Sequence, residues 1–370
     1  MLDVAVPNVK RSCLYGVGEN RIVTFWLPLA SGVHVRALDA NMVAAHPSAA
    51  PARPLTHPTT PLEALRVRNF PFDTTGTWYR GNIHSHSSKS DGLLSPADVV
   101  NAYRERDYDF LAITDHFLDR YSFPVTDTSC FRSSDFTTIL GAEMHVHGLQ
   151  NGIIWDLLAI GLPLDFPPHE AHETDLDLAK RAAATGAFVA IPHPGWNGVV
   201  HSDGERLIEA VDAIEIYNEG HTLDSDRGSG WFLADSLATA GHRFSTFAAD
   251  DAHFKLDRFD RFGGWINVRA ESLDPESLLA AMKRGHYYAS TGATIRNVEI
   301  RETEIVVETN PAIGIMLGGA GTVRQYVRGD NLTRATFNRA MFQSAFFRVI
   351  VIESHNRKAW SSPIWLDEAG

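Results

Sequence analysis

Cysteine is scarce in this 370-residue chain, which contains only Cys13 and Cys130. Two widely separated cysteines exclude a disulfide scaffold and a cysteine-based metal motif, and they suit a reducing compartment. The N-terminal residues include an acidic side chain at position 3 and no long apolar region, so we expect no secretory signal peptide. The expected location is therefore cytoplasmic.

Long hydrophobic runs and an excess of basic charge are also missing. The most apolar stretch, residues 152–164, is interrupted by Asp156 and is too short to span a bilayer. The chain has 33 basic and 45 acidic residues, a net charge of −12, so we expect no general affinity for nucleic-acid polymers. The expected partner is a small-molecule substrate rather than a membrane, and no sequence feature indicates an oligomeric state.

The chain divides into four segments of different composition. Residues 1–45 contain short β-like runs separated by glycine and asparagine, and residues 46–77 form a proline-rich linker. Residues 78–292 alternate between strand-like and helix-like segments. Residues 293–370 show β alternation with glycine and asparagine turns, which predicts a small antiparallel β module.

The alternation within residues 78–292 predicts an α/β fold. Repeated strand–helix units imply parallel strands with helices outside, and their number favours a barrel over an open sheet. Ser95 and Pro96 mark one helix start as a cap and a first helical residue. The expected strands are 79–84, 110–114, 138–143, 156–160, 187–191, 213–217, 245–249 and 264–268, and the expected helices are 96–106, 175–185, 204–210, 230–240 and 275–284.

Histidine is frequent, with 17 residues, and many of them follow predicted strands. His84 and His86 share one face of a strand, because residues i and i+2 point the same way, and Asp91 follows in a loop that can fold back over them. Other strand ends carry similar side chains: Asp115 and His116, Glu143 with His145 and His147, His193, and Asp251 and His253.

These strand ends meet at one rim of a parallel barrel, where active sites form. The number of histidines and carboxylates exceeds what one ion needs and indicates two or three divalent ions. Asp250 suits this role less well than Asp251, which shares the strand parity of His253. Most of the histidines away from strand ends are expected to be ordinary polar residues; this set consists of His169, His172, His201, His221, His242 and His286.

The motifs HSHSSKSDG, LAITDH, GAE, IPHP and DDAH, in this order, resemble the PHP (polymerase and histidinol phosphatase) family over about residues 78–290. The flanks WYRGNIHSHS and DDAHF and the C-terminal KAWSSPIWL are similar to the branch that contains carbaryl-type carbamate hydrolases. The resemblance implies a distorted, TIM-like (β/α)7 barrel with small β-rich N- and C-terminal modules. It also implies two or three divalent ions, usually Mn, Fe or Zn.

The resemblance also assigns ligands. Where PHP proteins often complete a third site with histidine, this chain has Asp156, so Asp156 ligates, His145 or His147 substitutes, or the third site is weak or empty. Asp115 is expected to orient an imidazole. The matching residues are His84, His86, Glu143 and Asp251 for the first ion, Asp91, His116 and the shared Glu143 for the second, and His193 and His253 for the third.

Such a centre uses a metal-bridging hydroxide as its nucleophile. Glu143 would bridge the ions, and His145, His253 or Asp251 would protonate the leaving oxygen. His147, Asn218 and Arg227 are candidate substrate contacts. The loop residues Trp196, Phe254, Lys255 and Arg258 do not decide whether the rim suits a phosphate or a neutral aromatic group.

The sequence therefore favours a metal-dependent hydrolase of a small phosphoester. The alternative is cleavage of a carboxylic or carbamic ester by the same kind of centre. A non-catalytic PHP module is the third hypothesis, and it is the least favoured because nearly all the expected metal ligands are present.

Overall fold

The computed structural model describes residues 70–149, 152–170 and 172–367. The chain divides into two compact units, Met1–Pro61 and Leu62–Gly370, and the described residues belong to the second. The predicted β-rich segment 1–45 and most of the predicted linker 46–77 lie outside the described residues. Among the described residues, the helices are too short or too polar to cross a membrane.

Four of the seven α-helices among the described residues begin after a side chain that accepts from a free N–H group of the first turn. Ser95 accepts from the Asp98 amide and Pro96 is the first helical residue, so α1 (Pro96–Arg104) starts where the sequence predicts. Thr174 and Asp177 form a reciprocal capping box at the start of α2. The other helices are α2 (Asp175–Ala184), α3 (Pro194–Asn197), α4 (His201–Leu207), α5 (Glu219–Ser225), α6 (Trp231–Thr239) and α7 (Pro275–Lys283).

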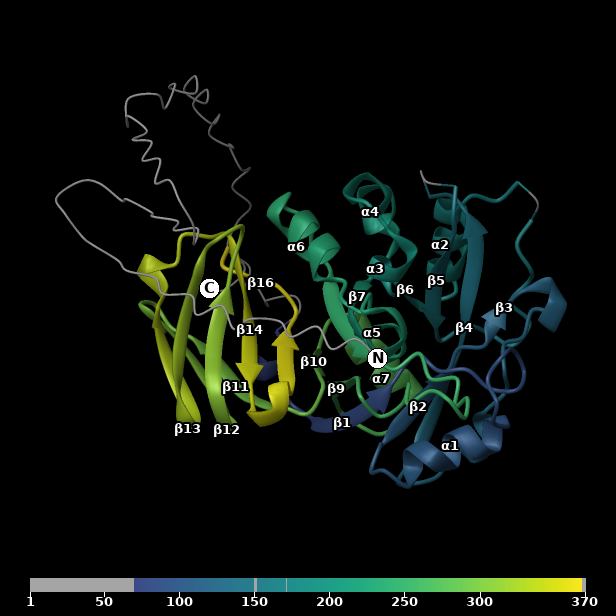
Figure 1. Ribbon diagram of the computed structural model, residues 1–370, viewed down its shortest axis with the longest axis horizontal. Coiled ribbons are helices and arrows are strands. Elements are labelled where there is room, and N and C mark those ends of the chain that lie inside the picture. The colour runs from purple at the N-terminus through teal and green to yellow at the C-terminus, as the bar shows by residue number, and fades with distance from the viewer. Residues whose placement is uncertain (1–69, 150–151, 171, 368–370) are drawn as a thin grey trace, which may run out of the picture. The chain divides into compact units, whose positions relative to one another are not determined.

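The central strands alternate with helices along much of the chain, so the predicted mixed α/β class is confirmed (Figure 1). Neighbouring strands are parallel except in the two pairs that involve β5. Strands β2, β6 and β8 are buried along their whole length, which is typical of strands covered on both faces. The hydrogen-bonded order is β1 (Thr77–Asn82), β2 (Phe110–Ile113), β4 (Thr137–His147), β5 (Ile154–Ile160), β6 (Phe188–Ile191), β7 (Ala213–Asn218) and β8 (Ser245–Ala249).

The strand series departs from a regular repeat of strand and helix at β4 and β5. These two strands follow one another closely and pair antiparallel, with His145 opposite Asp156. Strand β4 continues to His147, beyond the predicted 138–143, and this added length pairs with β5 to form a hairpin. A regular (β/α)7 repeat is therefore not shown.

Hydrogen bonds also join the two ends of this strand series. The His86 amide donates to the Ala252 carbonyl at 2.8 Å, and the Asp251 amide donates to the His84 carbonyl at 2.9 Å. Ser85 and Ala252 form a parallel bridge between these contacts. The residues that follow β1 thus lie beside those that follow β8, and side chains from the first and last strands reach the same place.

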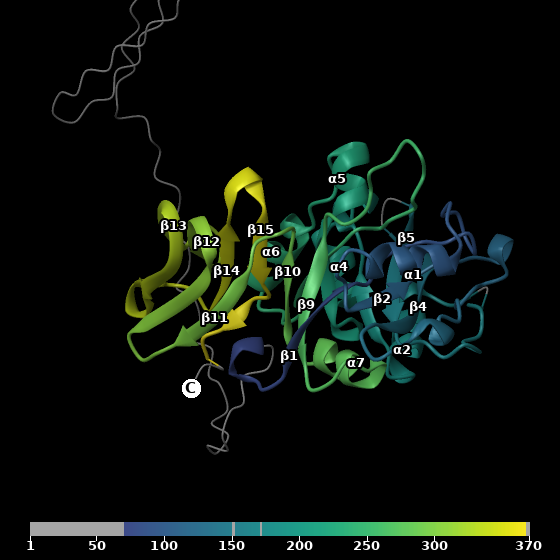
Figure 2. The same ribbon diagram turned by 90° about the horizontal axis from the view of Figure 1, so that it is seen from below.

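The strands that follow residue 294 form an antiparallel region, seen as a yellow-green to yellow group in Figures 1 and 2. Strands β9 (Trp265–Ala270) and β10 (Tyr287–Ser290) connect this region to β1 in one continuous sheet. Phe70 and Phe72, from the end of the predicted linker, pack into its apolar core. Its strands are β11 (Ile295–Ile300), β12 (Glu304–Gly318), β13 (Arg324–Asn338), β14 (Phe346–Ile352), β15 (Lys358–Ser361) and β16 (Ile364–Trp365). The domain boundary at residues 292 and 293 falls between β10 and β11 and stays a prediction.

Gly81 has no room for a side chain, because a Cβ there would overlap the ring of Phe110 on the neighbouring strand β2. Phe110 is fully buried, so we expect Gly81→Ala to lower the free energy of unfolding by about 1–3 kcal/mol. Denaturant unfolding followed by circular dichroism measures this loss. Gly314→Ala is the control, because the nearest atom to its Cβ would be 3.7 Å away. An equal loss in both variants would contradict the prediction.

Candidate metal centre

The side chains that follow the predicted strand ends converge on one cluster. Among the described residues, groups of three or four histidines and carboxylates have ligand atoms that all lie within 4.8 Å of one another. The groups share members, so they form one continuous centre. They are His84–His86–Glu143, His84–His193–Asp251, His86–Asp91–His116–His253, His116–Glu143–His145 and Glu143–Asp156–His193.

Glu143, on β4, lies in the middle of this centre. Its Oε1 is 2.8 Å from His193 Nε2 and 3.5 Å from His84 Nε2. Its Oε2 is 2.8 Å from His116 Nδ1 and 3.4 Å from His86 Nε2. The two oxygens of one buried carboxylate thus face different pairs of imidazoles, which is the arrangement that a bridging ligand requires.

Asp251 is the second carboxylate that contacts both His84 and His86. Its Oδ1 is 2.9 Å from His86 Nε2 and 3.4 Å from His84 Nε2. Strand β8 ends at Ala249, and Asp251 has a left-handed backbone with φ of 57°. Non-glycine residues adopt this conformation rarely, and such residues are concentrated at functional sites.

His253 lies in a different group from the one that the PHP resemblance implies. Its Nε2 is 3.3 Å from Asp91 Oδ1, and His116 Nε2 is 3.2 Å from the same oxygen. His193 instead approaches Glu143 on the other side of the centre, and none of the groups found among the described residues contains both histidines. Lys255 Nζ lies 3.3 Å from Asp91 Oδ2, at the edge of the centre.

The turn after Asp251 explains the position of His253. The His253 amide donates to Asp260 at 2.9 Å, and its Nδ1 lies 2.9 Å from the Asp251 carbonyl oxygen. A donating Nδ1 leaves the Nε2 lone pair free to bind a cation beside Asp91. Strand parity, from which the sequence paired Asp251 with His253, does not apply here because the strand has already ended.

Asp156, the residue that departs from the PHP pattern, points into the centre from β5. His145 Nδ1 contacts Asp156 Oδ1, and His193 Nε2 lies 3.8 Å from Asp156 Oδ2. Asn197 donates to the same Oδ2 at 3.1 Å. Both Asp156 and His145 are therefore placed where a third ion could bind. The third alternative, His147, lies at the end of β4, and its side chain is outside the described part of the structure.

The centre contains buried polar atoms that lack a hydrogen-bond partner among the described residues. Unpaired buried polar atoms are costly, and a divalent cation would satisfy several of them at once. Mixed imidazole and carboxylate donors suit Mn, Fe or Zn. The residues present therefore fit the implied ions. The unpaired atoms are His84 Nε2, His86 Nε2, Asp91 Oδ1, Glu143 Oε2 and Asp251 Oδ1.

The electrostatics of the centre favour the ligand forms of Glu143 and His86, whereas at His84 and His116 the effect of burial is outweighed by nearby carboxylates, which raise the pKa of both imidazoles. Burial opposes ionisation of Glu143, but the nearby His116 and His84 hold its pKa well below its usual value. Burial, together with the neighbouring His116 and His253, lowers the pKa of His86 to about 4. A carboxylate that stays ionised and an imidazole that stays neutral can both bind a cation at neutral pH.

Glu215, on β7, supports two of the candidate ligands and was missed by the sequence analysis. Its Oε1 lies 3.4 Å from His84 Nδ1, the ring nitrogen that faces away from the centre. Its Oε2 accepts from the His193 amide at 2.6 Å and from Asn218 Nδ2 at 3.1 Å. Carboxylates in this position orient ligand histidines and raise their basicity. The available signal was a charged residue between the apolar Ile214 and Ile216.

Asp115 positions a loop rather than an imidazole, contrary to expectation. It accepts from the Ser87 amide and hydroxyl, both at 2.7 Å, and from the Ser90 hydroxyl at 2.7 Å. Thr126 also donates to it, at 2.6 Å. These bonds fix the loop that carries Asp91.

His221 is a second residue that the sequence analysis missed. It lies in α5, which is capped by Asn218 and therefore begins beside the centre. Its Nε2 is 3.2 Å from Asp251 Oδ2, and its ring stacks on Trp196 with centroids 4.5 Å apart. The sequence analysis discounted His221 because it does not directly follow a strand, and it did not anticipate this short helix.

The predicted substrate contacts are placed less favourably than the metal ligands. Asn218 is fully buried and donates to Glu215 and to Asp251, while its Oδ1 accepts from the His221 amide. It is therefore placed to position Asp251 rather than to meet a substrate. Arg227 is exposed in the loop after α5. The side chain of His147 is not among those described.

No protein-family model and no curated protein matches the chain. It is similar to a solved two-domain protein from Bacteroides vulgatus that contains a predicted PHP-like metal-dependent phosphoesterase, with 15% identity, a TM-score of 0.47 and coverage of 78% of this chain and 94% of that one. It is also similar to the structure of a predicted metal-dependent phosphoesterase from Bifidobacterium adolescentis, with 16% identity, a TM-score of 0.37 and coverage of 55% and 96%. A third similar structure is an amidohydrolase from Chromobacterium violaceum, with 16% identity, a TM-score of 0.34 and coverage of 47% and 87%. The function of this chain is therefore inferred from its own side chains.

Removing the charge of Glu215 tests its role at His84 and His193. We expect Glu215→Gln to weaken Mn²⁺ binding by about 10- to 100-fold, because an uncharged amide supports the ligand histidines less well. Calorimetric titration of the metal-free protein with Mn²⁺ measures this change. The control is Glu308→Gln on the exposed part of β12, which should bind Mn²⁺ as the unaltered protein does. Unchanged affinity in Glu215→Gln would show that Glu215 does not act on the ligands.

Proposed function

We propose that this protein is a hydrolase with two or three divalent metal ions that acts on a small phosphoester. The observation that carries the proposal is the convergence of unpaired buried nitrogen and carboxylate oxygen atoms around Glu143. The PHP resemblance, with its distorted (β/α)7 barrel, is part of the same proposal. The hydrogen bonds that join the segments after β1 and β8 support it.

The residues divide into three overlapping binding groups. In this proposal Glu143 is shared, and Asp156, His145 and His193 make up the third group. Bound divalent ions would supply an activated water molecule and stabilise negative charge on the substrate. The first group consists of His84, His86, Glu143 and Asp251, and the second of Asp91, His116, Glu143 and His253.

The side chains of the chain hold and orient these groups. Asp91 and His116, with 30% and 17% of their side chains exposed, form the open side of the centre, where a substrate can enter. Lys255 contacts Asp91, and Lys89 lies in the same loop as Asp91. The positive charge of Lys255 at the open side, with Lys89 two residues from Asp91 in the sequence, favours an anionic phosphoryl group over a neutral one. In this proposal Glu143 would bridge the ions. One of Asp251, His253 and His145 would protonate the leaving oxygen.

A carboxylic or carbamic ester is the second candidate substrate. The observation that favours it is the pairing of Arg258, a residue considered for phosphate binding, with Asp224 at 3.1 Å. Lys255 is likewise engaged by Asp91, which reduces the positive charge available to a phosphoryl group. The resemblance to the carbamate hydrolase branch agrees with this candidate.

Removal of a single central ligand should abolish hydrolysis. We expect His84→Ala and Glu143→Ala to lower turnover by at least about 10²–10³-fold, because each contributes to the stabilisation of charge at the reacting group. The fold should be largely kept, as circular dichroism can show. His242→Ala, which alters a histidine outside the cluster, is the matched control. Near-normal turnover in either ligand variant with metal present would contradict the site.

A panel of substrates separates the two candidates. We expect nitrophenyl phosphate to be cleaved at least about tenfold faster, in kcat/KM, than nitrophenyl acetate or a naphthyl carbamate, because the lysines add positive charge at the open side. The panel also includes bis-nitrophenyl phosphate and a nucleotide, each with Mn, Fe and Zn. Preference for the carbamate would favour the second candidate, and inactivity towards every ester would overturn both.

A further inference from the structure

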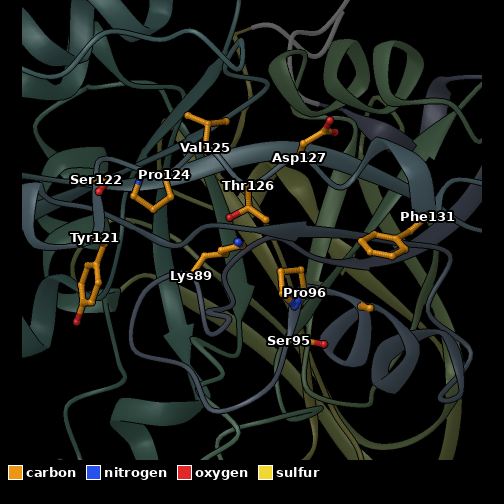
Figure 3. Close-up of a pocket in the computed structure, with 11 residues that line it drawn as sticks. Lys89, Ser95, Pro96, Tyr121, Ser122, Pro124, Val125, Thr126, Asp127 and Phe131 are labelled. Carbon is orange, nitrogen blue, oxygen red and sulfur yellow. The ribbon is translucent and has the colours of Figure 1, made fainter.

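A groove of about 610 Å³ lies between the start of α1 and the segment that follows β3 (His116–Phe117). Figure 3 shows its lining, with Tyr121 and Phe131 at opposite ends. Pro96, Pro124 and Val125 provide apolar surface between them, and Lys89 reaches in from the loop that carries Asp91. Its volume lies within the range of small-molecule sites.

The groove borders the open side of the metal centre. The ring of Tyr121 stacks on the ring of His116, with centroids 6.4 Å apart and an angle of 18° between the planes. Thr126, on the groove wall, donates to Asp115, the residue that fixes the loop carrying Asp91. The wall of the groove therefore contacts the exposed edge of the centre through the ring of Tyr121, and it contacts the loop that carries Asp91 through the hydrogen bond from Thr126 to Asp115.

The shape of the groove is held by the fold. Ser122 and Phe123 adopt consecutive left-handed conformations, with φ of 62° and 49°, which turn the chain sharply after Tyr121. Phe123 packs against the buried Phe117, with ring centroids 5.2 Å apart. Thr138, on β4, donates to the Thr128 carbonyl at 2.8 Å and ties down the far end of the segment.

We propose that this groove binds the alcohol portion of the ester substrate, and that this portion is a flat apolar group of the size of a phenyl or naphthyl ring. The proposal rests on the function proposed above, since it assigns the reacting group to the metal centre and the rest of the substrate to the groove. The lining also contains the polar Ser95, Ser122 and Asp127, and the assignment is carried by its apolar part together with Tyr121, whose ring stacks on that of His116 at the open side.

Burial of an aromatic ring against such a wall strengthens binding by about 10- to 100-fold. Two phosphonates isolate this contribution, because methylphosphonate and phenylphosphonate share an uncleavable head group and differ only in the ring. Phenol carries the ring without the head group. Calorimetric titration of the Mn²⁺-loaded protein with each of the three compounds separates the groove from the centre.

Ala97 on α1 lines the groove outside the metal centre, so Ala97→Trp should fill it. We expect phenylphosphonate to bind at least about tenfold more tightly than methylphosphonate, and Ala97→Trp to abolish that difference while methylphosphonate binds as before. Asn101→Trp places the same side chain at an exposed position on the same helix and should change neither affinity. Phe131→Ala, which removes part of the wall, should reduce the difference without filling the groove.

The outcomes distinguish the two proposals. Equal affinities for the two phosphonates in the unaltered protein, or an undiminished advantage of the ring in both Ala97→Trp and Phe131→Ala, would overturn the groove proposal. The phosphoester proposal would be overturned if neither phosphonate bound the unaltered protein. If phenol still bound the unaltered protein but did not bind Ala97→Trp, the groove proposal would be supported. Failure of all three compounds to bind would overturn both proposals.

Discussion

The buried carboxylate of Glu143 is the interaction on which the rest of the centre depends. It meets imidazoles that come from the segments after β1, β2 and β6, at distances of 2.8–3.5 Å. An ionised carboxylate without water is costly unless opposite charge or a cation lies beside it. The strands therefore have to bring donors to it from far apart in the chain. The backbone hydrogen bonds between residues 84–86 and 251–252 hold the segment after the first strand, β1, beside the segment after the last strand of the series, β8.

Much of this centre could be predicted from the sequence, because its ligands follow buried strands. Phe110–Ile113 and Phe188–Ile191 are short apolar runs typical of interior strands, and polar residues that follow such runs, such as His116 and His193, are expected near a strand end. The shared rim follows from the direction of parallel strands. The partner of His253 could not be predicted, since the left-handed turn at Asp251 depends on contacts with Asp260 and with the segment after β1.

The supporting residues were harder to recognise for a related reason. Glu215, His221 and Asp115 act through partners far away in the chain: Glu215 contacts a histidine 131 residues earlier in the sequence. A single polar residue in a strand or a short helix has no local pattern that reveals such a partner. The hairpin of β4 and β5 was missed similarly, because each strand looks ordinary alone and only their pairing reverses the direction of β5.

The balance of charge at the centre bears on the class of substrate. Glu143, Asp156 and Asp251 are buried carboxylates of the centre and Asp91 is a partly exposed one, so two divalent cations would neutralise the four negative charges. With two ions, attraction for a phosphoryl group would then come mainly from Lys89 and Lys255. A third ion at Asp156 and His193 would add two positive charges beside the carboxylates of the centre. Asp156 adds one negative charge that a neutral side chain in its place would not, so within the proposed function it lowers the attraction of the centre for a highly charged ester.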